Sequence, residues 1–121
     1  MKASFGFALV LGLLLIEVSQ AGAHAFLERA DPRVGSTVRT APTQVRLYFT
    51  EKLEPAFSSV RVVSGTGEQV DKGDAQVEPT SPKQLRVSLP PLPPGTYKVI
   101  WRVLSVDTHV TEGEFSFHFA P

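Results

Sequence analysis

The sequence Gly95-Thr96-Tyr97-Lys98-Val99-Ile100-Trp101-Arg102-Val103-Leu104 predicts the β-strand that organises the fold. Starting at Tyr97, every second side chain is a large apolar group, which is the period of a strand that buries one face. The intervening positions also include Ile100 and Leu104. We therefore expect a central strand that is buried on much of both faces, with Trp101 in the core.

Other segments show the same alternation of apolar and polar side chains, and turn residues separate them. The alternating segments are 44–49, 59–62, 84–89 and 114–119, and the turns lie at 64–67, 71–74 and 90–95. No part of the chain carries a clear helical stripe. Short strands joined by such turns predict an all-β fold, an antiparallel β-sandwich. Gly95-Thr96-Tyr97 resembles the corner tyrosine of immunoglobulin-like sandwiches, whose hydroxyl bonds back to nearby backbone.

The start of the chain has the pattern of a signal peptide. A positive first stretch precedes the apolar residues 5–16, and Ala21-Gly22-Ala23 is the small-residue pattern that signal peptidase recognises. The predicted organisation is a signal peptide at 1–23 followed by one domain at 24–121. We expect this domain to be exported, to a bacterial periplasm or the cell exterior.

The composition excludes several kinds of site. The chain has no cysteine, which excludes thiolate sites for zinc, copper(I) or iron–sulfur clusters. Its formal net charge is zero and no basic stripe is visible, so nucleic-acid binding has little support. The one methionine is Met1, so the predicted mature domain carries no thioether.

His24 would become the first residue of the protein if the signal peptide ends at Ala23. A free N-terminal histidine offers its α-amine and its ring Nδ1 to one metal ion, which an internal histidine cannot do. Asp107 and His109 are two residues apart, so in an extended segment their side chains point to the same side. An amine, two imidazoles and a carboxylate favour Cu(II), with zinc as a competitor. A cut after Ala25 would remove His24 and with it this site.

Motifs spread over the whole predicted domain occur in a specific order. They are His24, the run Phe49-Thr50-Glu51-Lys52-Leu53, the run from Leu92 to Val103, and Ser105-Val106-Asp107-Thr108-His109 followed by Gly113. In this combination they resemble the CopC family of small periplasmic copper-binding proteins of the copper-resistance type.

The resemblance implies a Greek-key β-sandwich or barrel, immunoglobulin-like, with Cu(II) held at one end. Its ligands would be the amine and imidazole of His24, the carboxylate of Asp107 and the imidazole of His109. Glu51 would be a weak axial ligand or a partner of the ligands. The missing methionine-rich segment places the chain with members that have a Cu(II) site only, and Val110 stands where many members have proline. The implied function is copper sequestration, resistance or delivery without catalysis, with a membrane copper importer or another periplasmic copper protein as partner.

Two other functions stay open on the residues alone. His24 with His109 also resembles the histidine brace of copper oxygenases that cut polysaccharides. An immunoglobulin-like interaction module without metal is the second alternative. His118 is expected to be a solvated residue on the polar face of the last strand. Arg102 either orients Asp107 by a charge-assisted hydrogen bond or lies on a solvated face.

Overall fold

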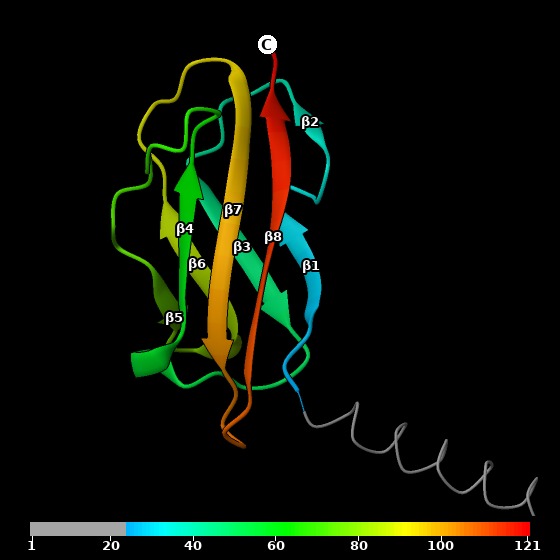
Figure 1. The fold of residues 1–121 in the computed structure, drawn as a ribbon, viewed down its shortest axis with the longest axis vertical. Coiled ribbons are helices and arrows are strands. Elements are labelled where there is room, and N and C mark those ends of the chain that lie inside the picture. The colour runs from blue at the N-terminus through cyan, green and yellow to red at the C-terminus, as the bar shows by residue number, and fades with distance from the viewer. Residues whose placement is uncertain (1–23) are drawn as a thin grey trace, which may run out of the picture.

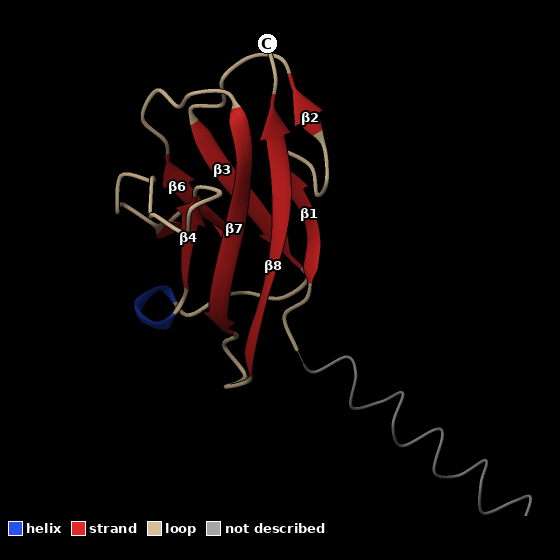
Figure 2. Cartoon of the chain, turned by 45° about the horizontal axis from the view of Figure 1, so that its top comes forward, coloured by secondary structure: helices blue, strands red, loops and turns tan. Residues whose placement is uncertain are grey.

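The chain folds into two β-sheets that pack face to face (Figures 1 and 2). The structure, a computed structural model, describes residues 24–121, and the predicted signal peptide lies outside the described residues. Its strands are β1 (Leu27–Asp31), β2 (Thr37–Val38), β3 (Gln44–Phe49), β4 (Ser59–Val63), β5 (Gln76–Glu78), β6 (Ser81–Ser88), β7 (Gly95–Leu104) and β8 (Val110–Phe119). One sheet has the order β1-β3-β6-β5 and the other β2-β8-β7-β4.

The connections of the sandwich carry the chain repeatedly from one sheet to the other. It changes sheet in each of the four connections from β1 to β5, and again between β6 and β7. Within the described residues, the only helix is the one-turn 3-10 helix η1 (Pro55–Phe57), between β3 and β4. The predicted all-β, immunoglobulin-like Greek-key sandwich is therefore confirmed.

The longest strand pair is the hairpin of β7 and β8. Its register runs from Gly95 opposite Phe119 to Leu104 opposite Val110, and both strands have 10 residues. In Figure 1 this hairpin spans the full height of the sandwich and turns at its lower end. Residues 105–109 form that turn, so the sequence motif with Asp107 and His109 lies at one end of the fold.

The core lies between the sheets and is made by the alternating apolar side chains. Its fully buried members include Val45, Leu47, Leu85, Val87, Val99, Val103 and Phe117. Burying one such side chain stabilises the fold by about 1.5–3 kcal/mol, so this layer supplies most of the driving force for folding. The alternation in the sequence thus identified β3, β4, β6, β7 and β8 correctly.

The prediction that residues 97–104 are buried on much of both faces is wrong for one face. The outward side chains Lys98 and Arg102 are exposed, while Ile100 and Leu104 are half-buried. The strand is central within its sheet, but a two-layer sandwich leaves the outer face of each sheet in water. Trp101 is half-buried and packs edge-on against Phe49 of the opposite sheet, with ring centroids 5.2 Å apart.

Three strands escape the alternation signal because they are short or lie at sheet edges. β1 carries charged side chains and is mostly exposed, while β2 and β5 have 2 and 3 residues. β1 and β5 are the two edge strands of one sheet, and β2 is an edge strand of the other. Short, charged edge strands are a common protection against strand pairing between molecules, and they lack the alternation of a core strand.

At the end opposite residues 105–109, proline-rich residues 90–94 connect β6 to β7. The hydroxyl of Tyr97 donates a hydrogen bond to the carbonyl of Pro93 in this connection. The corner-tyrosine role predicted for Tyr97 is therefore confirmed.

Candidate metal centre

Three segments that are far apart in the sequence meet at one end of the sandwich (Figure 1). They are residues 24–26 before β1, residues 50–53 after β3, and the loop 105–109. The backbone N–H of Thr50 donates to the carbonyl of Phe26 at 2.9 Å, and that of Val106 donates to Lys52 at 3.0 Å. The segment after β3 thus connects the first residues of the domain to the loop.

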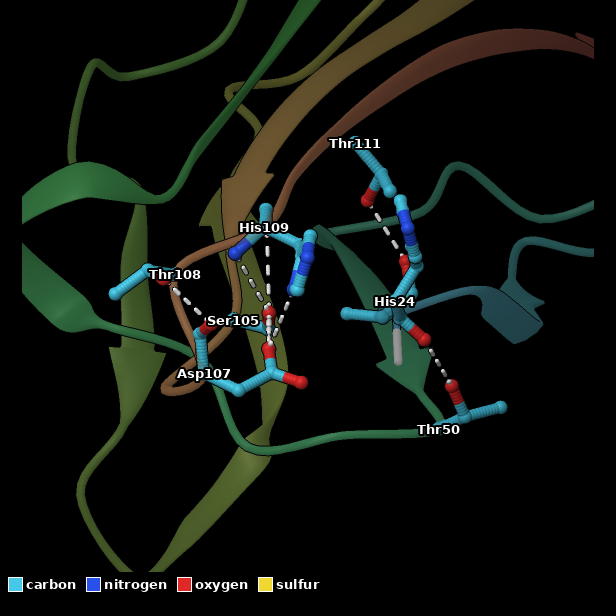
Figure 3. Close-up of polar contacts among 8 residues, drawn as sticks. His24, Thr50, Ser105, Asp107, Thr108, His109 and Thr111 are labelled. Carbon is cyan, nitrogen blue, oxygen red and sulfur yellow. Dashed lines mark hydrogen bonds and ion pairs between the residues drawn. The ribbon is translucent and has the colours of Figure 1, made fainter. Parts of the chain in front are cut away.

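The first residues of the domain are held in place by two neighbouring strands. Ala25 is fully buried, and its carbonyl accepts a hydrogen bond from the Thr111 hydroxyl at 2.7 Å. The hydroxyl of Thr50 accepts from the backbone N–H of Phe26 at 2.9 Å and lies 3.4 Å from the carbonyl oxygen of His24. These contacts fix the position of His24 relative to β3 and β8. Figure 3 draws the ones that Thr111 and Thr50 make with the two carbonyls.

The histidine rings of the two predicted segments face one another. The ring centroids of His24 and His109 lie 4.6 Å apart, with 31° between the ring planes. Nδ1 of His109 lies 3.4 Å from Oδ1 of Asp107, and both of these side chains are about half exposed. All three predicted ligand residues therefore come together at this end of the fold, as Figure 3 shows.

The neighbours of Asp107 favour the ionised form of its carboxylate. The Ser105 hydroxyl donates a hydrogen bond to Oδ1, and this bond is the main cause that lowers the pKa of Asp107. The hydrogen bond and charge of His109 lower the pKa further. An ionised carboxylate is the form that can bind a metal ion.

The chemical types of the donors fit copper. The contacts among their side chains, however, join them only in pairs. Among residues 24–121, no group of three or more His, Cys, Asp or Glu side chains surrounds a common metal position. His24 pairs with His109, and His109 pairs with Asp107. The further donor, the nitrogen of His24, becomes an amine only when the bond to Ala23 is cut. Three nitrogen atoms and one carboxylate oxygen are a set that suits Cu(II).

The other residues considered from the sequence lie apart from these contacts. Glu51 follows Thr50 and is half-buried, and it takes part in none of the contacts that join His24, Asp107 and His109. The suggestion that Arg102 orients Asp107 is wrong, because the Arg102 guanidinium pairs with Glu112 at 3.4 Å. The expectation for His118 holds in part.

His118 lies on the outer face of β8 near the opposite end of the fold. It is half-buried there, and its Nδ1 lies 2.8 Å from the hydroxyl of Thr96. It is therefore a partly solvated strand residue with a hydrogen-bond partner of its own. It lies at the end of β8 that is far from His24 and His109.

Sequence reasoning missed the residues that hold the ligands. Ser105 stands two positions before Asp107, the same spacing that joins Asp107 to His109. That spacing was the available signal. Thr50 and Thr111 carry no such signal, because their contacts with residues 24–26 join segments 24 and 86 positions apart.

In the part of the chain that the structure describes, no helix has the length and apolar character needed to cross a membrane.

Comparisons with known proteins identify the family of the chain and support the fold. A CopC domain model matches residues 27–120. Protein YobA of Escherichia coli K12 is 34% identical over 115 residues, covering 94% of this chain and 93% of that protein. The crystal structure of CopC from Methylosinus trichosporium OB3b superposes with a TM-score of 0.72 at 37% identity, covering 81% of this chain and 95% of that one.

A second solved structure comes from a copper-resistance protein. PcoC of Escherichia coli, described as a methionine-rich copper resistance protein, superposes with a TM-score of 0.69 at 33% identity. The match covers 80% of this chain and 99% of that one. The chain belongs to the CopC family and is a copper-binding protein of the copper-resistance type.

Proposed function

We propose that this protein is an exported periplasmic protein that binds Cu(II) at His24, Asp107 and His109, for sequestration or delivery of copper. The observation that carries the proposal is the ring-to-ring approach of His24 and His109, 4.6 Å between centroids, with Asp107 beside His109. This contact brings together two of the chain's three histidines, one from its first third and one from its last.

The proposal includes a mature chain that starts at His24. Its support is the burial of Ala25, which is 0% exposed and accepts a hydrogen bond from Thr111. A cut after Ala25 would remove a residue of the core and leave the Thr111 hydroxyl without that acceptor. A cut after Ala23 keeps this packing and converts the His24 nitrogen into a chelating amine.

The proposed oxidation state is Cu(II). PcoC is described as methionine rich, whereas the only methionine of this chain is Met1. Cu(I) prefers thioether and thiolate ligands, and residues 24–121 offer neither. Nitrogen and carboxylate ligands suit Cu(II), and Glu51 stays a candidate for a weak axial ligand because it follows Thr50 at the same end of the fold.

We propose binding without catalysis. A copper oxygenase of the histidine-brace type needs an open position in the plane of the ion for oxygen. Asp107 stands beside His109, where its carboxylate would take part of that plane. The proposed role therefore requires an ion held by all of its ligands and released to another protein.

The partner would be a membrane copper importer or another periplasmic copper protein. Three apolar side chains near the candidate ligands are about half exposed: Phe26 at 48%, Val106 at 51% and Val110 at 48%. Phe26 stacks on His24, Val106 lies in the loop next to Asp107, and Val110 directly follows His109. Apolar side chains around a metal site provide area that a protein partner can bury during transfer.

The test is a Cu(II) titration of the domain followed by electron paramagnetic resonance. Protein that begins at His24 should bind one equivalent of Cu(II) with a nitrogen-rich signal. A control with one glycine added before His24 keeps every side chain but turns the His24 nitrogen into an amide, so that His24 no longer chelates through its own amine. Equal Cu(II) affinity and an identical spectrum for the two proteins would contradict the proposed site. Copper-dependent peroxide production with ascorbate, together with oxidised sugar products, would favour the oxygenase alternative.

A further inference from the structure

Ser105 occupies a special position in the candidate metal centre. It directly follows β7, it is 0% exposed, and it pairs with Leu53 in an isolated antiparallel bridge. Its backbone closes the loop: its N–H donates to the carbonyl of His109 at 3.0 Å, and its carbonyl accepts from the N–H of Thr108 at 2.9 Å. The base of the loop is therefore anchored in the core, while its tip is exposed.

The hydroxyl of Ser105 touches both ligand residues of the loop. It donates to the carboxylate of Asp107, and it accepts from the backbone N–H of His109 at 3.3 Å. The carbonyl of His109 lies 3.2 Å from the same hydroxyl. A hydroxyl has one proton to donate, and an ionised carboxylate is a stronger acceptor than a carbonyl. The proton therefore goes to Asp107, and the lone pairs face His109.

The loop is held in a conformation that its sequence does not favour. Thr108 has φ of +72°, a left-handed conformation that is rare for a β-branched residue. Such backbone strain persists where the surrounding contacts determine the conformation, and it occurs often at functional sites. Here the contacts of Ser105 determine the conformation of the loop. Asp107 and His109 contact each other across this turn, with Nδ1 of His109 3.4 Å from Oδ1 of Asp107, although the backbone is not the extended one expected from their spacing.

We propose that Ser105 is the positioning residue of the metal centre, whose hydroxyl holds the carboxylate of Asp107 and the backbone of His109 ready before the ion arrives. This inference rests on the proposed function of the site. Binding to a preformed loop avoids the entropy cost of ordering it when the ion binds. Groups that orient metal ligands typically change affinity by about 10–100-fold when they are removed.

The experiment compares variants of Ser105 in protein that begins at His24. Ser105→Ala should weaken Cu(II) binding by about 10-fold or more, measured by competition with a chelator, and should change the electron paramagnetic resonance spectrum. Ser105→Thr keeps the hydroxyl and should restore most of the affinity and the original spectrum. A residue that served stability alone would not show this spectroscopic change.

Ser58→Ala is the matched control. Ser58 is also buried at this end, and its hydroxyl accepts from the N–H of Leu104 at 3.2 Å without contacting Asp107 or His109. It should lower the midpoint of thermal unfolding and leave affinity and spectrum unchanged. The same loss of Cu(II) affinity in Ser58→Ala as in Ser105→Ala would overturn the positioning role.

Two further outcomes separate this inference from the proposed function. If the unaltered protein binds no Cu(II), the proposed function fails and the positioning role fails with it. If it binds Cu(II) and Ser105→Ala keeps both affinity and spectrum, the positioning role alone is overturned. Hydrogen exchange of the metal-free protein tests the preformed loop without any substitution: the amides of Thr108 and His109 should exchange more slowly than those of a free peptide, and unprotected amides would contradict it.

Discussion

The two ends of the sandwich use the same residue types with different results. At one end Ser105 lowers the pKa of Asp107, and at the other Ser88 lowers the pKa of Asp74 through its hydroxyl and its backbone N–H. A histidine occurs near each end as well. His109 contacts both Asp107 and His24, whereas His118 contacts Thr96. The two ends differ in which segments of the chain the fold brings together there.

Connectivity explains why one end concentrates metal donors and the other does not. Asp107 and His109 share a single loop, and the segment after β3 places His24 beside that loop. Asp74 and His118 are attached to different sheets, since Asp74 bonds to β6 and His118 belongs to β8. A pair of donors becomes a metal site only when the topology brings a third donor within reach.

The largest expected effect comes from comparing the removal of one histidine at each end of the sandwich. His109→Ala should weaken Cu(II) binding by more than the roughly 10–100-fold that loss of an orienting partner costs, because it deletes a ligand itself. His118→Ala should leave the affinity unchanged, because its ring bonds to Thr96. Chelator competition measures both. Equal losses in the two variants would place copper on a surface without specific ligands and would erase the difference between the ends.

A second contrast compares a glycine of β8, Gly113, with one in the turn after β4, Gly65. A methyl group on Gly113 would lie 2.6 Å from Cζ2 and 3.1 Å from Cε2 of Trp101, the residue opposite it on β7. Gly113→Ala should destabilise the fold by about 1–2 kcal/mol, since overpacking costs about 1–3 kcal/mol and alanine recovers part of this by restricting the unfolded chain.

Gly65→Ala is the control at the opposite end. A methyl group there meets only the carbonyl oxygen of Thr96, at 4.0 Å, so the change in unfolding free energy should stay within about 0.5 kcal/mol. Urea unfolding followed by Trp101 fluorescence measures both variants. A Gly113→Ala protein as stable as the original would mean that the indole moves aside at no cost.

Much of the fold could be predicted because its signal is local. Alternation identified β3, β4, β6, β7 and β8, and the turn chemistry at 90–95 identified the connection that Tyr97 fastens. The error on the outer face of β7 has a physical cause: Ile100 and Leu104 are apolar yet half-buried, and a sequence does not state how many layers cover a strand. The edge strands were missed because they bury little.

The candidate site was predictable only in part, because only some of its features have a local signal in the sequence. The spacing of Asp107 and His109 is a local pattern, and the structure brings His24 to His109 as expected. The groups that hold them could not be found in this way. The bond from Thr111 to Ala25 joins residues 86 positions apart, and it exists because β8 and the first residues lie side by side only in the folded sandwich.

The smallest expected effect concerns the serine–aspartate pair without metal donors. Ser88 lowers the pKa of Asp74, so the ionised form is favoured in the folded state. Its contribution to stability is present above the unfolded pKa of about 3.9, and it is lost as the pH falls through the folded pKa. Asp74→Asn should therefore be slightly less stable near pH 7, and its difference from the original protein should vanish in acid.

Ser88→Ala completes the comparison with Ser105→Ala. It removes the hydroxyl and keeps the backbone N–H that donates to Asp74 at 2.8 Å, so only part of the pH dependence should disappear. Urea unfolding of the metal-free protein between pH 2 and pH 7 measures this. Parallel loss of stability in Asp74→Asn and the original protein would show that the pair contributes nothing. The expected result is that the same Ser–Asp hydrogen bond affects acid stability at one end and copper binding at the other, because only Asp107 has histidines beside it.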